Sequence, residues 1–247
     1  MLVLALDTTG RPGSLALVRD GRLLAERAGE ASRAPGERLP GEIAALLQAL
    51  GLTVADIDVY AVTTGPGSFT GMRVGIATIQ GLALVNGRKV VPVSALEALA
   101  CQRGLTDAER VAAWIDARRG EVFAGLYGAA RAAESAPDPA TGLVELIPPE
   151  VGTPEALLER WRERGHFAGP PLVFTGDGAT AHRSAIERAC GADARIIAPP
   201  ACLAGLVGEI ATARAEAGGS VSPHAIAPVY VRRSDAEIAR EKRDARR

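Results

Sequence analysis

The sequence is poor in cysteine and in aromatic residues, and each shortage excludes a class of protein. Aromatic residues make up 4% of the 247 positions, so most of the core has to be built from smaller side chains. The three cysteines, Cys101, Cys190 and Cys202, are widely spaced and odd in number. Their spacing matches neither a disulfide framework nor a zinc site, and we expect a reducing, cytoplasmic location.

The sequence also has almost no net charge and no long apolar run. The formal charge of −1 gives no argument for binding to nucleic acid or to a membrane through bulk electrostatics. No apolar run reaches the roughly 18 residues that a membrane-spanning helix needs. The apolar start at residues 1–6 is interrupted by Asp7 and has no basic region before it, so we do not expect a signal peptide. With 47% hydrophobic and 23% charged residues, the chain is predicted to be globular.

Histidines are few and lie far apart. His166, His182 and His224 form neither a His-Glu-x-x-His nor a His-x-x-x-His pattern, so no protein-only metal site is predicted. The sequence has no Gly-x-Ser-x-Gly elbow, and no nucleophile stands in a recognisable pattern with a base. We therefore predict no catalytic residue and disfavour a metallopeptidase.

What the sequence does contain is a repeated order of strands and helices. The first half predicts strands at 2–6, 14–18 and 22–27, a helix at 37–50, a strand at 57–63, a helix at 70–86, a strand at 89–93 and a helix at 94–103. The second half predicts strands at 111–115, 121–127 and 144–147, a helix at 154–164, a strand at 172–175, a helix at 179–189, a strand at 195–197 and a helix at 202–217. Both halves follow the order β-β-β-α-β-α. We therefore predict an α/β fold of two duplicated halves, with an N-terminal lobe at 1–103 and a C-terminal lobe at 104–247.

The most distinctive stretch is the glycine-rich turn Gly65–Arg73, between a predicted strand and a predicted helix. Free backbone N–H groups at such a helix start could bind an anion near Gly67 and Ser68. The turn lacks the lysine of a phosphate-binding P-loop, and three residues separate Gly67 from Gly71 where a dinucleotide fingerprint has two. The alternative is a tight turn whose helix is capped by Ser68 or Thr70. Both interpretations stay open from the sequence.

Two other turns could contribute to an anion or nucleotide site. Asp7, Thr8 and Thr9 end the first predicted strand, and their oxygen atoms suit a phosphate or a hydrated metal ion. Gly176 and Gly178 follow a strand in the second half. The alternative at the first turn is local bonding of the Asp and Thr side chains to the backbone.

Two helices of the first half carry conspicuous apolar faces. The stripe on helix 37–50 consists of Leu39, Ile43, Leu46, Leu47 and Leu50, and one side of helix 70–86 consists of Met72, Ile76, Ile79 and Ala83. The second helix is apolar nearly all round, so it has to be covered on more than one face. A buried helix of a monomer and a subunit interface both satisfy this requirement.

The last residues, 232–247, carry seven Lys or Arg against four Asp or Glu. This composition predicts a solvated terminus or a basic helix from Ser234 that contacts RNA.

The glycine-rich turn resembles the signature of the TsaB family, bacterial proteins of threonylcarbamoyl-adenosine biosynthesis in tRNA. Four further stretches fit the family, and together the matches are spread over most of the chain. These stretches are Leu6–Thr9, Val93–Ala100, Asp116–Phe123 and Pro228–Arg232.

The resemblance implies an actin-like (ASKHA) fold with two lobes, each similar to ribonuclease H. It also implies a required, non-catalytic partner of the subunit TsaD, acting with the ATPase TsaE to transfer a threonylcarbamoyl group to the adenosine beside the anticodon. The family docks through its N-terminal-lobe helices, here 37–50 and 70–86, and forms a homodimer through the same surface when alone. It implies no tightly bound cofactor, with ATP or ADP and magnesium in the assembled complex, and tRNA reached through that complex.

One departure from the family is visible at the start of the first helix. Many members carry His-Ser-Glu there, whereas this chain has Pro35-Gly36-Glu37. A rival interpretation from a different class is an active actin-like phosphotransferase or ATPase. It would use Asp7, Thr8, Thr9 and the turn at 176–178 around ATP and magnesium.

Overall fold

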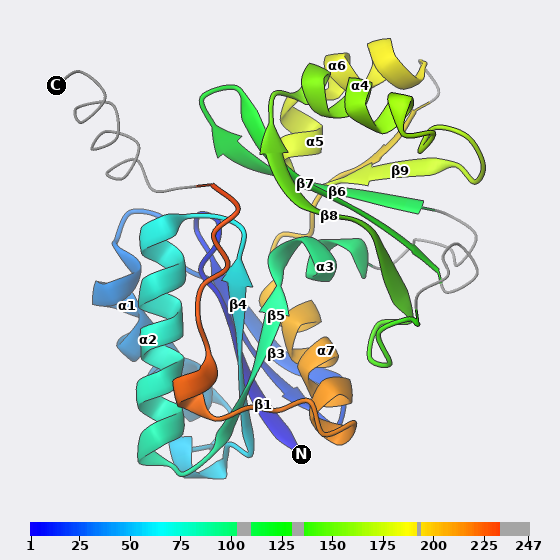
Figure 1. Ribbon diagram of the computed structural model, residues 1–247. Helices are drawn as coiled ribbons and strands as arrows, with labels where there is room; N and C mark the ends of the chain where they lie inside the picture. Colours follow the sequence, from blue (N-terminus) through cyan, green and yellow to red (C-terminus); the bar gives the residue numbers. More distant parts are fainter. Residues whose placement is uncertain (103–109, 130–135, 192–193, 233–247) are drawn as a thin grey trace, which may run out of the picture.

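The computed structural model describes residues 1–102, 110–129, 136–191 and 194–232 (Figure 1). These residues form two lobes, each built around a five-stranded sheet. The basic helix predicted from Ser234 lies outside the described residues, and the predicted boundary at residue 103 falls at the edge of one gap. Among the described residues, no helix is both long enough and apolar enough to cross a bilayer.

The first sheet consists of β1 (Leu2–Asp7), β2 (Ser14–Arg19), β3 (Arg22–Ala28), β4 (Val59–Gly65) and β5 (Lys89–Ser94), in the order β3-β2-β1-β4-β5. The pairs β1–β2 and β2–β3 are antiparallel, and β4 and β5 add in parallel. Every residue of β1 and of β4 is buried, because helices cover both faces of the sheet. These strands therefore have continuous apolar sequences rather than alternating ones.

The second sheet repeats this arrangement with β6 (Arg110–Arg118), β7 (Glu121–Ala129), β8 (Leu143–Gly152), β9 (Leu172–Thr175) and β10 (Arg195–Ile197). Its order is β8-β7-β6-β9-β10, so the first, second and third strands of each half occupy equivalent places. The pairs β6–β7 and β7–β8 are antiparallel, and β9 and β10 are parallel to β6. The predicted α/β fold of two duplicated halves is confirmed.

Seven helices accompany the sheets in the described residues. They are α1 (Pro35–Ala49), α2 (Phe69–Val85), α3 (Ala95–Ala100), α4 (Pro154–Glu163), α5 (Asp177–Ala181), α6 (Arg183–Cys190) and α7 (Ala204–Glu216), with short 3-10 turns η1 (Val54–Asp56) and η3 (Pro223–Ala225). The side chains of Ser68, Ser94 and Thr153 accept hydrogen bonds at the starts of α2, α3 and α4. The helix predicted at 179–189 is instead two helices, because the backbone leaves helical geometry at His182.

Three apolar clusters hold the layers together. One lies between α1, α2 and the first sheet, and a second lies between the lobes around α3 and α7. The third lies in the second lobe, where the rings of Trp161 and Phe174 pack edge-on against Trp114 at 6.1 Å and 5.5 Å. Leucine and isoleucine dominate the first cluster, and alanine and valine dominate the second, in keeping with the scarcity of aromatic residues.

The end of the chain departs from the predicted lobe division at residue 103. Helix α7 belongs to the second half in sequence but packs against β1 and β2 of the first lobe (Figure 1). A Cβ atom at Gly208 would lie 2.5 Å from the Val18 side chain, so a glycine allows α7 to approach the sheet this closely. Residues after α7 stay on the first lobe, where Val221 pairs with Val90. The apolar face of the first sheet is thus covered by a helix from the second half.

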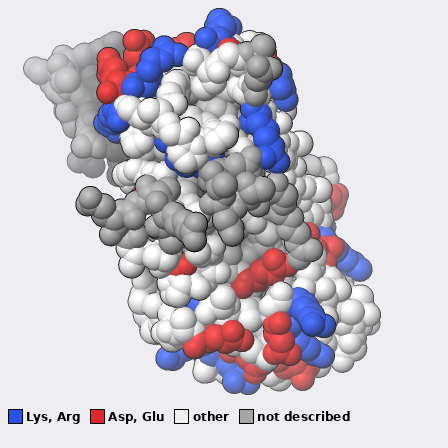
Figure 2. All heavy atoms as spheres, turned by 90° about the vertical axis from the view of Figure 1, so that its right-hand side faces the viewer, with Lys and Arg blue, Asp and Glu red and all other residues white. Residues whose placement is uncertain are grey.

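Residues 226–232, here called the C-terminal strap, then run along the first lobe to the contact between the lobes. The Val229 amide donates to the Thr64 carbonyl at 2.8 Å, and Arg232 pairs with Glu121 of the second lobe at 2.8 Å. Acidic and basic side chains are mixed over the side of the molecule shown in Figure 2. No single-sign field therefore covers the described part of that side, in keeping with the near-zero net charge.

Candidate functional site

A pocket of about 440 Å³ lies between the lobes, at the carboxyl ends of β1 and β4. The first lobe contributes the turn after β1 and the start of α2, and the second lobe contributes the β6–β7 turn. The C-terminal strap forms the remaining wall. The polar residues that line this pocket include Thr9, Arg11, Ser68, Asp116, Arg118, Asp177 and Arg232. We therefore ask which of the residues predicted to bind an anion line this pocket.

Asp7 does not face the pocket, because its carboxylate is used inside the first lobe. Its Oδ1 accepts hydrogen bonds from the Thr9 amide at 3.0 Å, from the Thr9 hydroxyl at 2.5 Å and from the Thr63 hydroxyl at 2.8 Å. The residue is 7% exposed. Asp7 thus fixes the turn after β1 against β4, which is the local bonding that the sequence left open.

Thr8 is buried against helix α2 and also lies away from the pocket. A Cβ atom at Gly75 would come within 2.2 Å of the Thr8 hydroxyl oxygen, and one at Gly71 within 2.1 Å of the Thr8 carbonyl oxygen. Any side chain at these two positions would collide with the turn. The glycines of this stretch therefore serve close packing of α2 on the end of β1.

The start of α2 lines the pocket but has already used several of its N–H groups. The Ser68 amide donates to the Thr9 carbonyl at 2.7 Å, and the Gly71 amide donates to the Ser68 hydroxyl at 3.2 Å. The Met72 amide donates to the Ser68 carbonyl at 2.9 Å. Gly67 sits against Thr9, where a Cβ atom would be 2.5 Å from the Thr9 Cβ. The prediction that Ser68 caps helix α2 is confirmed. Fewer backbone N–H groups therefore remain free to bind an anion.

Gly176 and Gly178 pack the start of α5 against β6. A Cβ atom at Gly176 would lie 1.9 Å from the Trp114 carbonyl oxygen, and one at Gly178 would lie 2.9 Å from the Ile115 carbonyl carbon. Between them, Asp177 accepts hydrogen bonds from the amides of Asp116 at 3.0 Å and Gly178 at 2.8 Å. Of the seven residues predicted for a nucleotide or anion, the structure places only Thr9, Gly67 and Ser68 in the pocket wall.

The carboxylates that line the pocket already have bonding partners within the protein. The carboxylates nearest the pocket are committed, Asp177 to backbone amides and Asp116 to Arg118 at 3.1 Å. The described residues include no group of three or more His, Cys, Asp or Glu able to hold a metal ion.

The sequence reasoning missed a cluster of aromatic and arginine side chains at the mouth of the pocket. The rings of Phe69 and Tyr230 stack at 4.8 Å, and the Arg73 guanidinium lies 3.9 Å from the centre of the Phe69 ring. Arg73 also donates to the Tyr230 hydroxyl at 2.7 Å. These partners are 157 residues apart, so only the strap brings them together. The resemblance of residues 228–232 to the family was the one signal that pointed there.

The predicted interface residues require a correction, because all but one are buried in the chain's own core. Helices α1 and α2 turn their apolar stripes toward the first sheet, where burial removes the most apolar surface from water. The residues at most 4% exposed are Leu39, Ile43, Leu46, Leu47, Met72, Ile76, Ile79 and Ala83. Only Leu50, which is 41% exposed, is available to a partner.

The opposite faces of α1 and α2 are exposed and, beyond Glu37 and Arg73 near the helix starts, carry uncharged residues. We call this surface the outer helical face, and it consists of Pro40, Gly41, Ala44, Ala45, Gln48 and Ala49 on α1, and of Ala77, Gly81, Leu84 and Val85 on α2. The two helices lie side by side against the first sheet (Figure 1). Val85 is 87% exposed and Leu84 is 47% exposed, which is unusual for branched apolar side chains.

Comparison with known proteins places this fold in a family. Residues 29–240 match the family model TsaD, described as tRNA N6-adenosine threonylcarbamoyltransferase. The chain belongs to this family. Its relatives include the tRNA threonylcarbamoyladenosine biosynthesis protein TsaB of Bacillus subtilis, 29% identical over 191 residues that cover 77% of each chain. TsaB of Escherichia coli is 38% identical over 128 residues, 51% of this chain and 55% of that protein.

Solved structures of the family agree over nearly the whole chain. A Pseudomonas aeruginosa protein described as similar to the peptidase YeaZ is 30% identical, covers 94% of this chain and 99% of its own, and has a TM-score of 0.71. YeaZ from the same organism is 28% identical, covers 93% and 99%, and has a TM-score of 0.69. The resemblance to TsaB predicted from the motifs is confirmed, as is the two-lobed fold.

Proposed function

We propose that the chain is a required, non-catalytic partner subunit in the threonylcarbamoylation of tRNA, at the adenosine next to the anticodon. The relatives named TsaB support a role in this biosynthesis. The observation that carries the partner role is the outer helical face, an exposed surface of uncharged residues on which Leu84 and Val85 are 47% and 87% exposed.

The chemistry of the inter-lobe pocket supports a role without catalysis by this chain. Asp7 and Asp177 hold turns, and the three histidines lie far apart along the sequence. A general base or a metal ligand needs a carboxylate or imidazole that faces the reacting groups. ATP or ADP with magnesium is therefore expected on the assembled complex, not tightly bound to this chain.

The outer helical face is suited to helices from another subunit. Small residues such as Ala44, Ala77 and Gly81 let a second pair of helices approach closely, and a Cβ atom at Gly81 would meet nothing within 4 Å. Leu84 and Val85 supply the apolar side chains that such a contact would bury. We propose TsaD as this partner, with TsaE acting on the pair and tRNA bound through the complex. A second copy of this chain would occupy the face when TsaD is absent.

The substitution Ala77→Arg tests this proposal, because it adds a long charged side chain to the centre of the exposed face without touching the core. We expect it to weaken binding to TsaD by at least about a hundredfold, since a buried unpaired charge costs roughly 3–5 kcal/mol. Binding is measured by calorimetry, and modification is measured in a reconstituted reaction with TsaD, TsaE, the threonylcarbamoyl-adenylate and tRNA.

The matched control is Ala156→Arg, which changes an exposed helical alanine on α4 in the other lobe. It should bind TsaD and support modification like the unchanged chain. Normal binding of the Ala77→Arg variant to TsaD would show that the interface lies elsewhere. If tRNA is fully modified when this chain is omitted, the partner role itself is wrong.

A further inference from the structure

Arginine side chains from four distant segments of the chain lie at the pocket between the lobes. Arg11, Arg118 and Arg232 line this pocket, from the turn after β1, the end of β6 and the end of the C-terminal strap. Arg73, near the start of α2, joins them through its contacts with two aromatic residues of the pocket wall. We call these four residues the arginine rim. The net charge of −1 for the whole chain does not reveal this local concentration.

Arg73 is held in place by aromatic contacts and keeps most of its donors free. Its guanidinium lies 3.9 Å from the centre of the Phe69 ring, and its Nε donates to the Tyr230 hydroxyl group at 2.7 Å. Among the described residues no other hydrogen bond or ion pair involves this exposed side chain. Since a guanidinium has five N–H donors, four remain for a ligand. A planar group that is already oriented also loses little conformational entropy when it binds an anion.

Arg11 has no bonding partner in the described part of the molecule, and its side chain is exposed. The last two arginines of the rim pair with Asp116 at 3.1 Å and with Glu121 at 2.8 Å. Asp177 is the other carboxylate that lines the pocket, and it accepts hydrogen bonds from backbone amides. Four guanidinium groups therefore face three carboxylates, and the charges of Arg11 and Arg73 are not neutralised by any described carboxylate.

The β6–β7 turn gives an independent indication that this edge of the pocket serves a ligand. Arg118 and Arg119 both have a left-handed backbone, with φ angles of 64° and 60°. Tight hairpin turns with two such residues favour Gly, Asn and Asp, because larger side chains strain the backbone there. Residues held in strained conformations cluster at ligand-binding sites. Two arginines at positions that favour glycine therefore indicate a role of this turn in binding.

Aromatic rings beside the rim suit the bases of a nucleic acid. Phe69 and Tyr230 stack at 4.8 Å, and Tyr230 remains 40% exposed. Proteins that bind single-stranded RNA combine such rings with arginines that contact the phosphates. The described chain ends at the rim, and the sequence that follows, 233–247, has six Lys or Arg against four Asp or Glu. Charge and aromatic surface therefore occur together at this place.

We propose that the arginine rim binds the sugar–phosphate backbone of tRNA, with an unpaired base against the exposed ring of Tyr230. The choice of tRNA as the RNA rests on the function proposed above, in which the chain takes part in tRNA modification. Phosphate groups spaced along a strand match guanidinium groups from four segments, and the free donors of Arg11 and Arg73 allow bidentate bonds to them. An acidic protein surface offers negative charge without bases to stack, so the aromatic pair favours RNA.

The test measures binding of the chain alone to an unmodified, fluorescein-labelled tRNA transcript by fluorescence anisotropy. We expect saturable binding at about 50 mM salt, and an affinity that falls linearly with salt on logarithmic axes because phosphate contacts release counterions. Two competitors separate the causes, since poly-L-glutamate offers carboxylates without bases and inorganic tripolyphosphate offers phosphates without bases. Both should displace the tRNA only at concentrations of anionic groups at least about tenfold higher than unlabelled tRNA requires.

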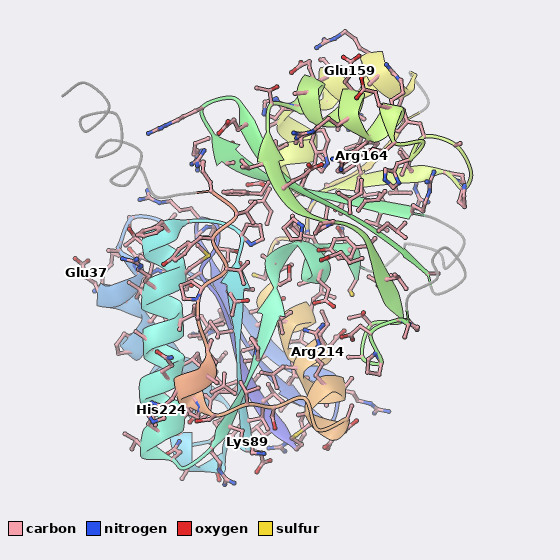
Figure 3. The ribbon with its side chains drawn as sticks, viewed as in Figure 1. Glu37, Lys89, Glu159, Arg164, Arg214 and His224 are labelled. Atoms are coloured by element: carbon pink, nitrogen blue, oxygen red, sulfur yellow. The ribbon has the colours of Figure 1, made fainter. Side chains whose placement is uncertain are left out.

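Three single variants locate the site on the rim. Arg11→Gln, Arg73→Gln and Arg118→Gln should each weaken binding at least about threefold and lower the slope of the salt dependence by about 1, because each removes one phosphate contact. Arg11 bonds to no described residue, so its substitution tests the site without disturbing the fold. The matched control is Arg164→Gln at the end of α4 in the second lobe (Figure 3), which removes an exposed arginine outside the pocket and should change neither affinity nor slope.

Three results would overturn the proposal. The first is the absence of tRNA binding by the chain at about 50 mM salt. The second is displacement of tRNA by poly-L-glutamate or tripolyphosphate as efficient as that by unlabelled tRNA, which would indicate an acidic protein or a free polyphosphate as the ligand. The third is unchanged affinity and slope in the folded Arg11→Gln and Arg118→Gln proteins.

Binding to TsaD, measured in parallel by calorimetry, separates this proposal from the proposed function. Arg11→Gln should bind TsaD like the unchanged chain, because Arg11 lies outside the outer helical face. Normal TsaD binding by a chain that binds no tRNA would overturn the role of the rim and leave the partner role standing. If the rim binds tRNA but modification proceeds fully without this chain, the partner role is wrong and the rim is confirmed.

Discussion

At the scale of single residues, glycines decide how closely helix α2 approaches the end of β1. Replacing Gly75 with alanine would place a Cβ atom 2.2 Å from the Thr8 hydroxyl oxygen, so the helix or the turn has to move. We expect Gly75→Ala to lower the free energy of unfolding by about 1–3 kcal/mol, the usual cost of overpacking. Chemical denaturation followed by circular dichroism measures this loss.

Gly81 on the same helix is the control for this prediction, because a Cβ atom there meets nothing within 4 Å. Gly81→Ala should raise the free energy of unfolding by about 0.5–1 kcal/mol, since alanine restricts the unfolded chain and favours a helix interior. Equal stabilities for the two variants would mean that Gly75 does not pack as closely as the structure indicates.

The structural role of a residue could be predicted from the sequence where a local rule determines that role. Ser68 as the cap of α2 follows from the residue types that close helix starts, and it is found there. The direction of the apolar stripe containing Ile76 and Ile79 was not predictable, because a stripe identifies a buried face without saying what covers it. The structure shows that the chain's own sheet covers it, and only the exposed residues such as Ala77 remain for a partner.

At the scale of elements, the C-terminal strap depends on the contact between Tyr230 and the start of α2. Tyr230→Ala removes both the stacking on Phe69 and the hydrogen bond from Arg73. We expect the strap to detach more often, so hydrogen exchange at the Val229 amide, which bonds to Thr64, should become at least about tenfold faster. Mass spectrometry of exchanged peptides measures this rate.

The variant Tyr230→Phe keeps the ring and loses only the hydroxyl group. Its exchange rate at Val229 should lie much closer to that of the unchanged chain, because stacked aromatic rings contribute most of the contact. Unaltered exchange in Tyr230→Ala would show that backbone bonds alone hold the strap.

The order of elements could be predicted because hydrophobic periodicity is a local property of the sequence. The surfaces against which each element packs could not be predicted in the same way, because they come from distant parts of the chain. The two strand-rich halves follow from apolar runs separated by turn residues, and the sheets confirm them. Helix α7 returns to the first lobe because it covers an apolar face of the first sheet, whose last strand ends about a hundred residues earlier in the sequence. No local pattern in residues 204–216 indicates that the helix packs there. The same holds for the strap and its contact with Phe69.

At the scale of the whole molecule, the two lobes are joined by ion pairs at separate places. Arg232 of the strap forms an ion pair with Glu121 of β7. Arg214 of α7 forms an ion pair with Asp138, in the turn before β8. Both arginines come from the segment that returns to the first lobe, and both carboxylates belong to the second. The returning segment therefore fixes the lobes relative to each other and shapes the pocket between them.

The Arg214–Asp138 pair predicts how acid affects this arrangement. Burial alone would raise the pKa of Asp138, but hydrogen bonds from Arg214 and from the amides of Ala140 and Thr141 outweigh it and hold the pKa below its ordinary value of 3.8. Because the pKa is lower in the folded than in the unfolded chain, the carboxylate stabilises the fold above that ordinary value. This stability is lost as the pH falls through the folded-state pKa.

We therefore expect the melting temperature of the unchanged chain to fall more steeply below about pH 4 than that of Asp138→Asn, which cannot lose this charge. Near pH 7 the variant should melt only a little lower, because the pair is partly exposed and screened by solvent. Glu159→Gln, at an exposed position on α4, should show the acid dependence of the unchanged chain. Parallel melting curves for the unchanged chain and Asp138→Asn would mean that Asp138 contributes nothing to the acid sensitivity of the lobe contact.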